Sequence, residues 1–244
     1  MSHYVKHEQC PECAKLGKDR SGNNLAIYSD GGSHCFSCGY HQSATGISSF
    51  KESQVGVTRT LGLPRDVDEK LPQVAWDFLG QYQLTERDAK VHLMLWSEEW
   101  KRLCFPIFDD TGLIAWQGRY LGTEHGKAKW FSQGDLKNIL HVVGHKQSNM
   151  VILTEDLLSA IKVSKVGNFA VSPIFGSHIS VQRVLRLKNY YDTLIVWLDK
   201  DKQKESANFA RDASLLGMKS YSIITDLDPK CYTLDQIRLL TMNE

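Results

Sequence analysis

The chain has 244 residues and a hydrophobic content of 42%, which suffices for one or two globular domains with a sizeable core. No apolar run approaches the roughly 18 residues of a membrane-spanning helix, and the polar N-terminus lacks a signal-peptide pattern. We therefore expect a soluble, cytoplasmic protein without a membrane partner. The formal net charge of +1 neither supports nor excludes nucleic-acid binding, because a local basic surface can hide in a neutral total.

Four of the six cysteines lie in the first 52 residues, as two C-x2-C pairs that are separated by 21 residues. Each pair offers two thiolates from one tight turn, so the two pairs supply a tetrahedral four-sulfur site for one structural Zn²⁺. Short apolar stretches over 25–29 and 34–36 flank a turn at 30–32, which predicts a β-hairpin between the pairs. We predict a zinc ribbon over residues 1–52 whose metal supplies much of the folding energy. The predicted ligands are Cys10, Cys13, Cys35 and Cys38.

The role of the ribbon has two interpretations. Zinc ribbons bind nucleic acid, but they also serve as plain interaction modules. Its aromatic side chains could stack on bases, or they could fill the small ribbon core. These side chains are Tyr28, His34, Phe36 and Tyr40.

Residues 53–72 lack clear periodicity and are punctuated by Gly62, Pro64 and Pro72, so we predict a linker there. The block over 73–148 is expected to begin with two helices, one starting after Pro72 and one capped by Thr85. A β-hairpin follows, with strands over 102–108 and 113–120.

The segment that leaves this hairpin is basic. Residues 101–146 contain seven Lys and Arg against four Asp and Glu. Arg119, Lys127 and Lys129 lie beside glycines and aromatic residues, an arrangement that suits phosphate groups. A charge run of this kind is also typical of a solvated face with no ligand.

Two apolar runs end abruptly in acids. Residues 151–154 lead into Glu155, and residues 194–198 lead into Asp199 and Asp201, and a helical pattern follows each run. Strand, acid and helix in repetition predict parallel strands joined by crossover helices, with ligands beyond the carboxyl ends of the strands. Asp199 and Asp201 would share one face in extended backbone, so with Glu155 they form a predicted Mg²⁺ site. The alternative for Asp201 is a cap on the following helix.

Together these elements predict an α+β protein with an α/β part. An N-terminal β zinc ribbon is tethered to a mixed α/β subdomain over 73–148. The remaining residues, 149–244, are predicted to form a domain with a central parallel sheet flanked by helices.

In this order the parts resemble the bacterial-type (DnaG-like) primases, most closely the primase module of bacteriophage primases. The four cysteines resemble the zinc-binding domain of that family, and residues 114–122 with 129–132 are similar to its basic region, where Trp130 replaces the usual Tyr. Residues 151–167 resemble the first motif of the family's TOPRIM domain, and 194–201 resemble its DxD motif. Asp228-Pro229-Lys230 resembles the later acidic motif. One departure is Asp156, since glycine usually follows the TOPRIM glutamate.

The resemblance implies synthesis of short RNA primers from ribonucleoside triphosphates on a single-stranded DNA template. It makes Glu155, Asp199, Asp201 and Asp228 the candidate catalytic residues, holding Mg²⁺ or Mn²⁺, with the ribbon reading the template. Arg119, Lys127 and Lys129 would contact the triphosphate or the template backbone.

The expected partners follow from the same resemblance. No G-x4-G-K-[ST] loop is present, so either a separate replicative helicase is expected, together with a DNA polymerase, or the chain is a piece of a primase–helicase fusion. If the chain is viral, its place is the cytoplasm of a bacterial host.

Two other functions stay open from the sequence. TOPRIM acids also serve nucleases, which cleave nucleic acid rather than extend it. A ribbon with a metal-incompetent TOPRIM domain could instead be a non-catalytic single-stranded DNA-binding protein or helicase adaptor.

Overall fold

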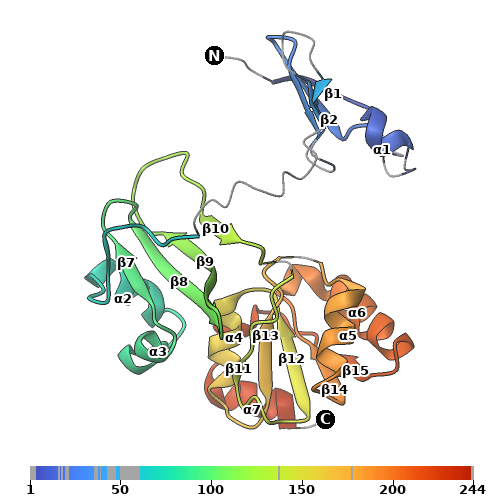
Figure 1. Ribbon diagram of the computed structural model, residues 1–244. Helices are drawn as coiled ribbons and strands as arrows, with labels where there is room; N and C mark the ends of the chain where they lie inside the picture. Colours follow the sequence, from blue (N-terminus) through green and yellow to red (C-terminus); the bar gives the residue numbers. More distant parts are fainter. Residues whose placement is uncertain are drawn as a thin grey trace. The chain divides into compact units, whose positions relative to one another are not determined.

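The computed structural model describes residues 4–15, 17, 19, 22–35, 38, 40–42, 48–49, 61–136, 138–176 and 178–242 (Figure 1). The chain divides into two compact units, Met1–Arg59 and Thr60–Glu244. Within the described ranges, no helix combines the length and the apolar character that a transmembrane span requires.

The first unit is a small antiparallel sheet of five strands in the order β1-β2-β3-β4-β5. The predicted hairpin is confirmed, because Leu25 of β2 pairs with Cys35 of β3 across a turn in which Asp30 accepts a hydrogen bond from the Gly32 N–H. Tyr40 packs against the small core, whereas Phe36 lies outside the described residues. The elements are β1 (Tyr4–Glu8), α1 (Pro11–Lys15), β2 (Leu25–Tyr28), β3 (Ser33–Cys35), β4 (His41–Gln42) and β5 (Ser48–Ser49).

The second unit begins with an antiparallel sheet in the order β10-β9-β8-β7-β6. The two predicted helices and the long hairpin β8–β9 are confirmed. At the start of α3, the Asp88 carboxylate accepts hydrogen bonds from the Thr85 N–H at 2.7 Å and the Thr85 hydroxyl at 2.8 Å. The elements are β6 (Val67–Asp68), α2 (Gln73–Gly80), α3 (Glu86–Val91), β7 (Leu95–Ser97), β8 (Arg102–Asp109), β9 (Gly112–Tyr120) and β10 (Trp130–Gly134).

The linker predicted over 53–72 is wrong in its second half. Strand β6 pairs with β7, and Leu71 is buried in the core of this unit. The Asp66 carboxylate accepts hydrogen bonds from the Ser97 hydroxyl at 2.8 Å and the Glu99 N–H at 2.7 Å. A two-residue strand has no detectable periodicity, which explains the error. Residues 53–60 of the predicted linker lie outside the described residues.

The second sheet of this unit has the order β11-β13-β12-β14-β15, with β11 antiparallel at one edge and the other four strands parallel. The predicted central parallel sheet is therefore confirmed. Its elements are β11 (Val143–Gly144), β12 (Met150–Thr154), α4 (Leu157–Ser164), β13 (Ala170–Pro173), α5 (Val181–Lys188), β14 (Thr193–Val196), η1 (Lys200–Lys202), α6 (Gln203–Leu215), β15 (Lys219–Ser222), η2 (Pro229–Cys231) and α7 (Leu234–Met242).

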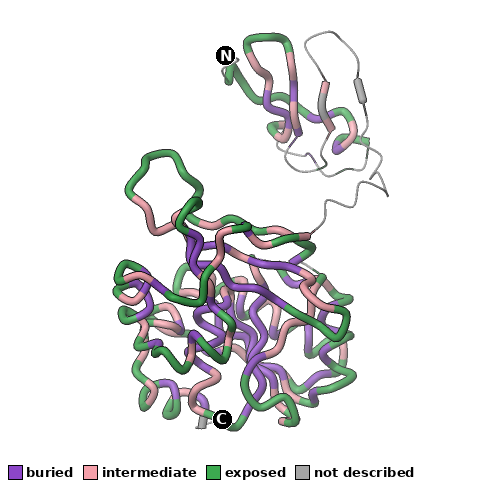
Figure 2. The backbone as a smooth tube through the Cα atoms, turned by 60° about the vertical axis from the view of Figure 1, so that its left-hand side comes forward, coloured by how far each residue is buried: buried purple, intermediate pink, exposed green. Residues whose placement is uncertain are grey.

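Helices cover both faces of this sheet, and the alternation along β12 shows why. Val151 and Leu153 pack on the side of α5 and α6, in one core with Val184. Ile152 between them packs with Ala160 on the side of α4 and α7 (Figure 1). The buried residues of this unit gather at its centre (Figure 2). Continuous apolar runs are typical of strands that are covered on both faces.

Helix α4 joins the two sheets of the second unit. Its Leu158 and Ile161 lie in one core with Leu103 and Phe105 of β8. The ammonium of Lys162, which is 1% exposed, donates to the Tyr82 carbonyl at 2.9 Å and to the Gln83 side chain at 2.7 Å. A buried lysine needs such partners, so this side chain fixes the α2–α3 loop against α4.

Candidate active site

Two acids meet at the carboxyl edge of the parallel sheet, as predicted. Glu155 directly follows β12, and Asp199 follows β14 after two residues. Leu153 is paired with Val196 in the parallel ladder, which brings the ends of the two strands side by side. The fold therefore places both carboxylates where ligands bind in open parallel sheets.

Asp201 is placed differently from the expectation. Strand β14 ends at Val196, and Asp201 lies in the short 3₁₀ turn η1, so the alternation of an extended strand does not apply. Its side chain is 70% exposed, and it forms an ion pair with Lys202 at 3.8 Å. The prediction that Asp199 and Asp201 share one face of a strand is thus wrong. Helix α6 begins after Lys202, and Asp201 does not cap it.

The two inner acids each have a buried oxygen that lacks a partner. Glu155 Oε2 and Asp199 Oδ1 accept no hydrogen bond from any described residue. Burial and then the charges of Asp199 and Asp201 raise the pKa of Glu155 to about 7. Burial also raises the pKa of Asp199 to about 6, although Lys230 opposes the rise. Unpartnered carboxylate oxygens that repel each other fit a divalent cation such as Mg²⁺ or Mn²⁺.

A lysine that the sequence reasoning did not assign to the site lies among these acids. The Lys230 ammonium contacts Asp156 Oδ2 at 2.8 Å, Asp199 Oδ2 at 3.0 Å and Asp228 Oδ2 at 3.3 Å. Burial opposes its charge, but Asp156 and Asp199 outweigh burial and raise the pKa of Lys230 above its ordinary value. The only signal in the sequence was its position two residues after Asp228. Asp228 itself lies beside η1, where its carboxylate accepts from the Lys200 N–H at 3.3 Å.

Asp156 has two roles in this arrangement. Its Oδ1 accepts a hydrogen bond from the Ser159 N–H at 2.7 Å and so caps α4, while its Oδ2 binds Lys230. Its backbone is extended, with φ −123° and ψ 167°, a conformation open to any residue. The backbone here therefore does not require the glycine found at this position in the resembled family.

A basic and aromatic face lies opposite the acids, on β9 and β10. Arg119 is paired with Trp130 across these strands. The Arg119 guanidinium carbon lies 5.1 Å from the centre of the Phe78 ring and 5.5 Å from that of Trp130. Because two rings hold it, Arg119 presents a fixed positive charge, as the recognition of phosphate requires.

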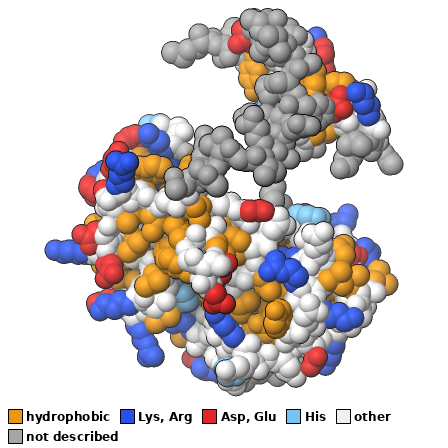
Figure 3. Space-filling view, in the orientation of Figure 1, with side chains coloured by type: hydrophobic (Ala, Val, Ile, Leu, Met, Phe, Trp, Pro, Cys, Tyr) orange, Lys and Arg blue, Asp and Glu red, His pale blue; other side chains and the backbone are white. Residues whose placement is uncertain are grey.

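Of the other two predicted basic residues, the structure brings one to the same place. Lys129 lines the cavity that also contains Arg119 and the acids. Lys127 does not line it, and it forms an exposed ion pair with Glu124 at 3.4 Å. Side chains of both charge signs are scattered over the face drawn in Figure 3.

These groups surround one cavity of 490 Å³ between the two sheets of the second unit. One wall is formed by Phe175, whose φ of +57° lies in the left-handed region that side chains other than glycine rarely adopt. Such strain clusters at functional sites. The full lining is Phe78, Tyr82, Gln117, Arg119, Lys129, Trp130, Ser132, Glu155, Asp156, Leu158, Phe175, Gly176, Asp199, Asp228 and Lys230.

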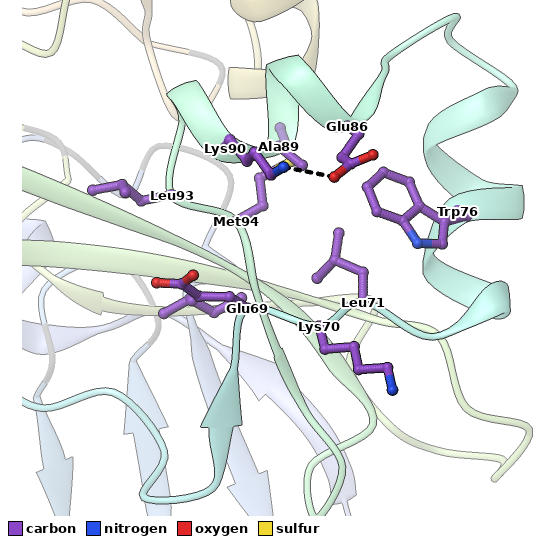
Figure 4. A pocket seen from close by; sticks show the side chains of 10 residues that line it. Glu69, Lys70, Leu71, Trp76, Glu86, Ala89, Lys90, Leu93 and Met94 are labelled. Atoms are coloured by element: carbon purple, nitrogen blue, oxygen red, sulfur yellow. Dashed lines mark ion pairs between the residues drawn. The ribbon is translucent and has the colours of Figure 1, made fainter.

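A larger cavity of 640 Å³ lies beside α2 and α3 (Figure 4). Trp76 and Met94 point into it, and its charged side chains include the ion pair of Lys90 with Glu86 at 2.6 Å. None of the predicted site residues lines this cavity. Its size alone therefore does not make it the candidate site.

The four predicted cysteines form a separate cluster in the ribbon. Their sulfur atoms all lie within 4.8 Å of one another, and no other His, Cys, Asp or Glu group in the described part of the chain is so close-set. Asp19 is 2% exposed and accepts hydrogen bonds from the Cys10 N–H at 2.7 Å and the Asn23 N–H at 3.1 Å. These bonds fix the turn that carries the first cysteine pair. Four sulfurs in this arrangement fit a structural Zn²⁺ site.

Comparison with solved structures identifies the fold. The Aquifex aeolicus primase, with its zinc-binding and RNA polymerase domains, matches with a TM-score of 0.60 at 13% identity, covering 99% of this chain and 78% of that chain. The DnaG primase catalytic domain bound to single-stranded DNA matches with a TM-score of 0.56 at 14% identity, over 70% of this chain and 71% of that chain. The RNA polymerase domain of Mycobacterium tuberculosis primase DnaG gives 0.55 at 14% identity, over 70% and 75%.

No protein-family model and no curated protein matches the chain. The structural likeness, at these identities, establishes a mixed α/β fold like that of the zinc-binding and RNA polymerase domains of DnaG-like primases.

Proposed function

We propose that this chain is a DNA primase that synthesises short RNA primers on single-stranded DNA by metal-dependent nucleotidyl transfer. One observation carries the proposal. A single cavity contains carboxylate oxygens at the ends of β12 and β14 that have no partner among the described residues and, opposite them, the cations Arg119 and Lys129. The likeness to a primase catalytic domain bound to single-stranded DNA supports it at the level of the fold.

The proposed chemistry explains why both kinds of charge are needed. A 3′-hydroxyl attacks the α-phosphorus of a ribonucleoside triphosphate, a new P–O bond forms, and pyrophosphate leaves. Negative charge develops on the phosphate oxygens, so fixed positive groups lower the barrier. Arg119 and Lys129 would contact the triphosphate or the template backbone from within the cavity, and Lys127, which lies outside its lining, would contact the template backbone.

The acids have the complementary task. Glu155 and Asp199, with Asp228 and the outer residue Asp201, would hold Mg²⁺ or Mn²⁺, a Lewis acid that offsets charge on the reacting phosphate. Without the ion, these carboxylates would repel the triphosphate. Phe78, Tyr82 and Trp130 form an aromatic wall in the same cavity, on which a base can stack.

We assign the remaining parts by the same proposal. The ribbon over 1–52 reads the template, and the parts over 73–148 and 149–244 together form the polymerase. A separate replicative helicase and a DNA polymerase are the proposed partners. The recognised template sequence does not follow from these residues.

A primer-synthesis assay tests the proposal. The zinc-loaded chain is given random single-stranded DNA, labelled ribonucleotides and Mg²⁺ or Mn²⁺, beside Glu155→Gln and the matched control Asp226→Asn, an exposed acid on the same loop as Asp228 that does not line the cavity. Short RNA products are expected from the wild type and the control, and none from Glu155→Gln.

Other outcomes would point to the other functions. Metal-dependent shortening of the DNA, without incorporation, would favour a nuclease. Binding of DNA without incorporation, even after a replicative helicase is added, would favour a non-catalytic adaptor.

A further inference from the structure

We infer that Lys230 takes the place of one cation at the carboxylate cluster, so that the site binds a single divalent metal ion per chain. This inference rests on the proposed function, because it concerns the metal requirement of the same cavity. In the rest of this section, the carboxylate cluster means Glu155, Asp156, Asp199 and Asp228.

The position of the ammonium supports the substitution. An ammonium has three N–H donors, and Lys230 Nζ lies 2.8, 3.0 and 3.3 Å from carboxylate oxygens of Asp156, Asp199 and Asp228. Its side chain is only 11% exposed. A fixed positive charge that is surrounded by three carboxylates occupies the place that a cation would otherwise take.

The oxygens that remain point to one further cation. Asp199 directs Oδ2 to Lys230, while its Oδ1 is buried without a partner among the described residues, as is Glu155 Oε2. In two-metal sites, a pair of cations about 3.5–4 Å apart clamps the attacking and leaving oxygens. Here one side of Asp199 faces an ammonium, and its other oxygen is left for a metal ion.

Lys230 is also held too firmly to yield easily to a second ion. It lies within η2, where the Cys231 N–H donates to the Asp228 carbonyl at 2.8 Å. Asp156, its nearest partner, is fixed in turn as the cap of α4. Asp156 stands where the resembled family usually has glycine, and the charge of its carboxylate is therefore neutralised by the Lys230 ammonium beside it.

Metal stoichiometry tests this inference independently of catalysis. Mn²⁺ binding is measured by titration calorimetry and by the EPR signal of free Mn²⁺, on the full zinc-loaded chain. Four cysteines prefer Zn²⁺ to Mn²⁺, so the ribbon does not take up the probe. The variants are Lys230→Ala and Lys230→Gln. Lys202→Ala is the matched control, since it removes a lysine that pairs with Asp201 and Glu205 at the same edge.

We expect one Mn²⁺ per chain for the wild type and for Lys202→Ala, and two for both Lys230 variants. Without Mn²⁺ the Lys230 variants should melt at a lower temperature than the wild type, because three carboxylates lose their partner. Mn²⁺ should raise their melting temperature more than that of the wild type.

Two Mn²⁺ on the wild type, none on it, or one on folded Lys230 variants would overturn the inference. If neither variant folds, the wild-type stoichiometry decides alone. Primer synthesis is measured on the same samples. Primers made with two bound Mn²⁺ would leave the proposed function standing and remove the inference. One Mn²⁺ on the wild type and two on the Lys230 variants, without primers on any template, would remove the proposed function and leave the inference standing.

Discussion

The two groups of candidate metal-binding side chains in this protein are held together in opposite ways. In the ribbon, four sulfurs lie within 4.8 Å of one another, and three of the four cysteines are buried. At the edge of the parallel sheet, the acids are spread around an open cavity, and an ammonium separates three of them. The cysteines form the core of the first unit. The acids lie beside the hydrophobic core of the second unit and are not part of it.

This difference indicates what a bound ion would contribute at each site. A four-cysteine site in a unit with few apolar residues makes the metal part of the folding free energy. The acids instead repel one another. Burial and neighbouring negative charge raise the pKa values of Glu155 and Asp199. We therefore expect loss of zinc to unfold the ribbon, and loss of the acids to remove activity while the fold remains.

The largest effect is expected for Cys13→Ser. The ribbon should lose its zinc and unfold, because structural zinc contributes on the order of 10 kcal/mol to such a fold. Zinc content is measured by mass spectrometry. All six tryptophans lie after residue 60, so tryptophan fluorescence reports the second unit, whose melting should not change. Cys231→Ser is the control and should keep its zinc. If Cys13→Ser also lowered the melting temperature of the second unit, the expectation that the two units unfold independently would be contradicted.

Asp199→Asn should lower the rate of primer synthesis by about 100-fold or more, since it removes a charge that holds the metal. The folded state should be at least as stable as that of the wild type, because a repelling charge is gone. Asp201→Asn should lower the rate by less than about 10-fold, since its side chain is 70% exposed and does not line the cavity. If single-turnover assays showed an equal loss of rate for Asp199→Asn and Asp201→Asn, the side chain of Asp201 would have to enter the cavity during the reaction.

Arg119→Lys should raise the KM for ribonucleoside triphosphates by about 10-fold. It retains the charge but loses the planar group that lies between Phe78 and Trp130. Lys127→Ala is the control and should change the KM less than about 2-fold, because this lysine lies outside the cavity lining. Steady-state kinetics with varied nucleotide distinguishes the two. A larger effect at Lys127 would place the triphosphate elsewhere.

A further effect, on folding stability rather than activity, is expected at acid pH in the second unit. Burial, and then the nearby charges of His92 and Lys146, lower the pKa of His141 to about 4. The unfolded chain takes up this proton near pH 6.5, so the contribution of His141 to folding stability falls as the pH drops from about 6.5 toward 4, by about 1–3 kcal/mol. His141→Gln should flatten this slope in urea unfolding followed by tryptophan fluorescence. An unchanged slope would assign the acid sensitivity to other groups.

Features that depend on neighbouring residues could be predicted from the sequence. The paired cysteines, the hairpin over β8 and β9, and the apolar runs that end at Glu155 and Asp199 each carry a local signal. Their meeting at one edge followed from the rule that parallel strands end together.

What depended on distant residues could not be predicted. Lys230 reaches Asp156 and Asp199 only because η2 lies at the carboxyl edge of the sheet. Asp201 was misplaced because a 3₁₀ turn interrupts the extended backbone after Asp199. The second half of the predicted linker was missed because β6 has only two residues and is stabilised by its partner strand.

The location of the nucleotide tests the central claim most directly. Crystals grown with Mn²⁺ and a non-hydrolysable ribonucleoside triphosphate allow the metal to be placed by its anomalous signal. We predict a manganese peak beside Glu155 and Asp199, with the triphosphate extending toward Arg119 and Lys129. A nucleotide bound instead in the larger cavity beside Trp76, or a manganese ion away from both acids, would contradict the assignment of this site.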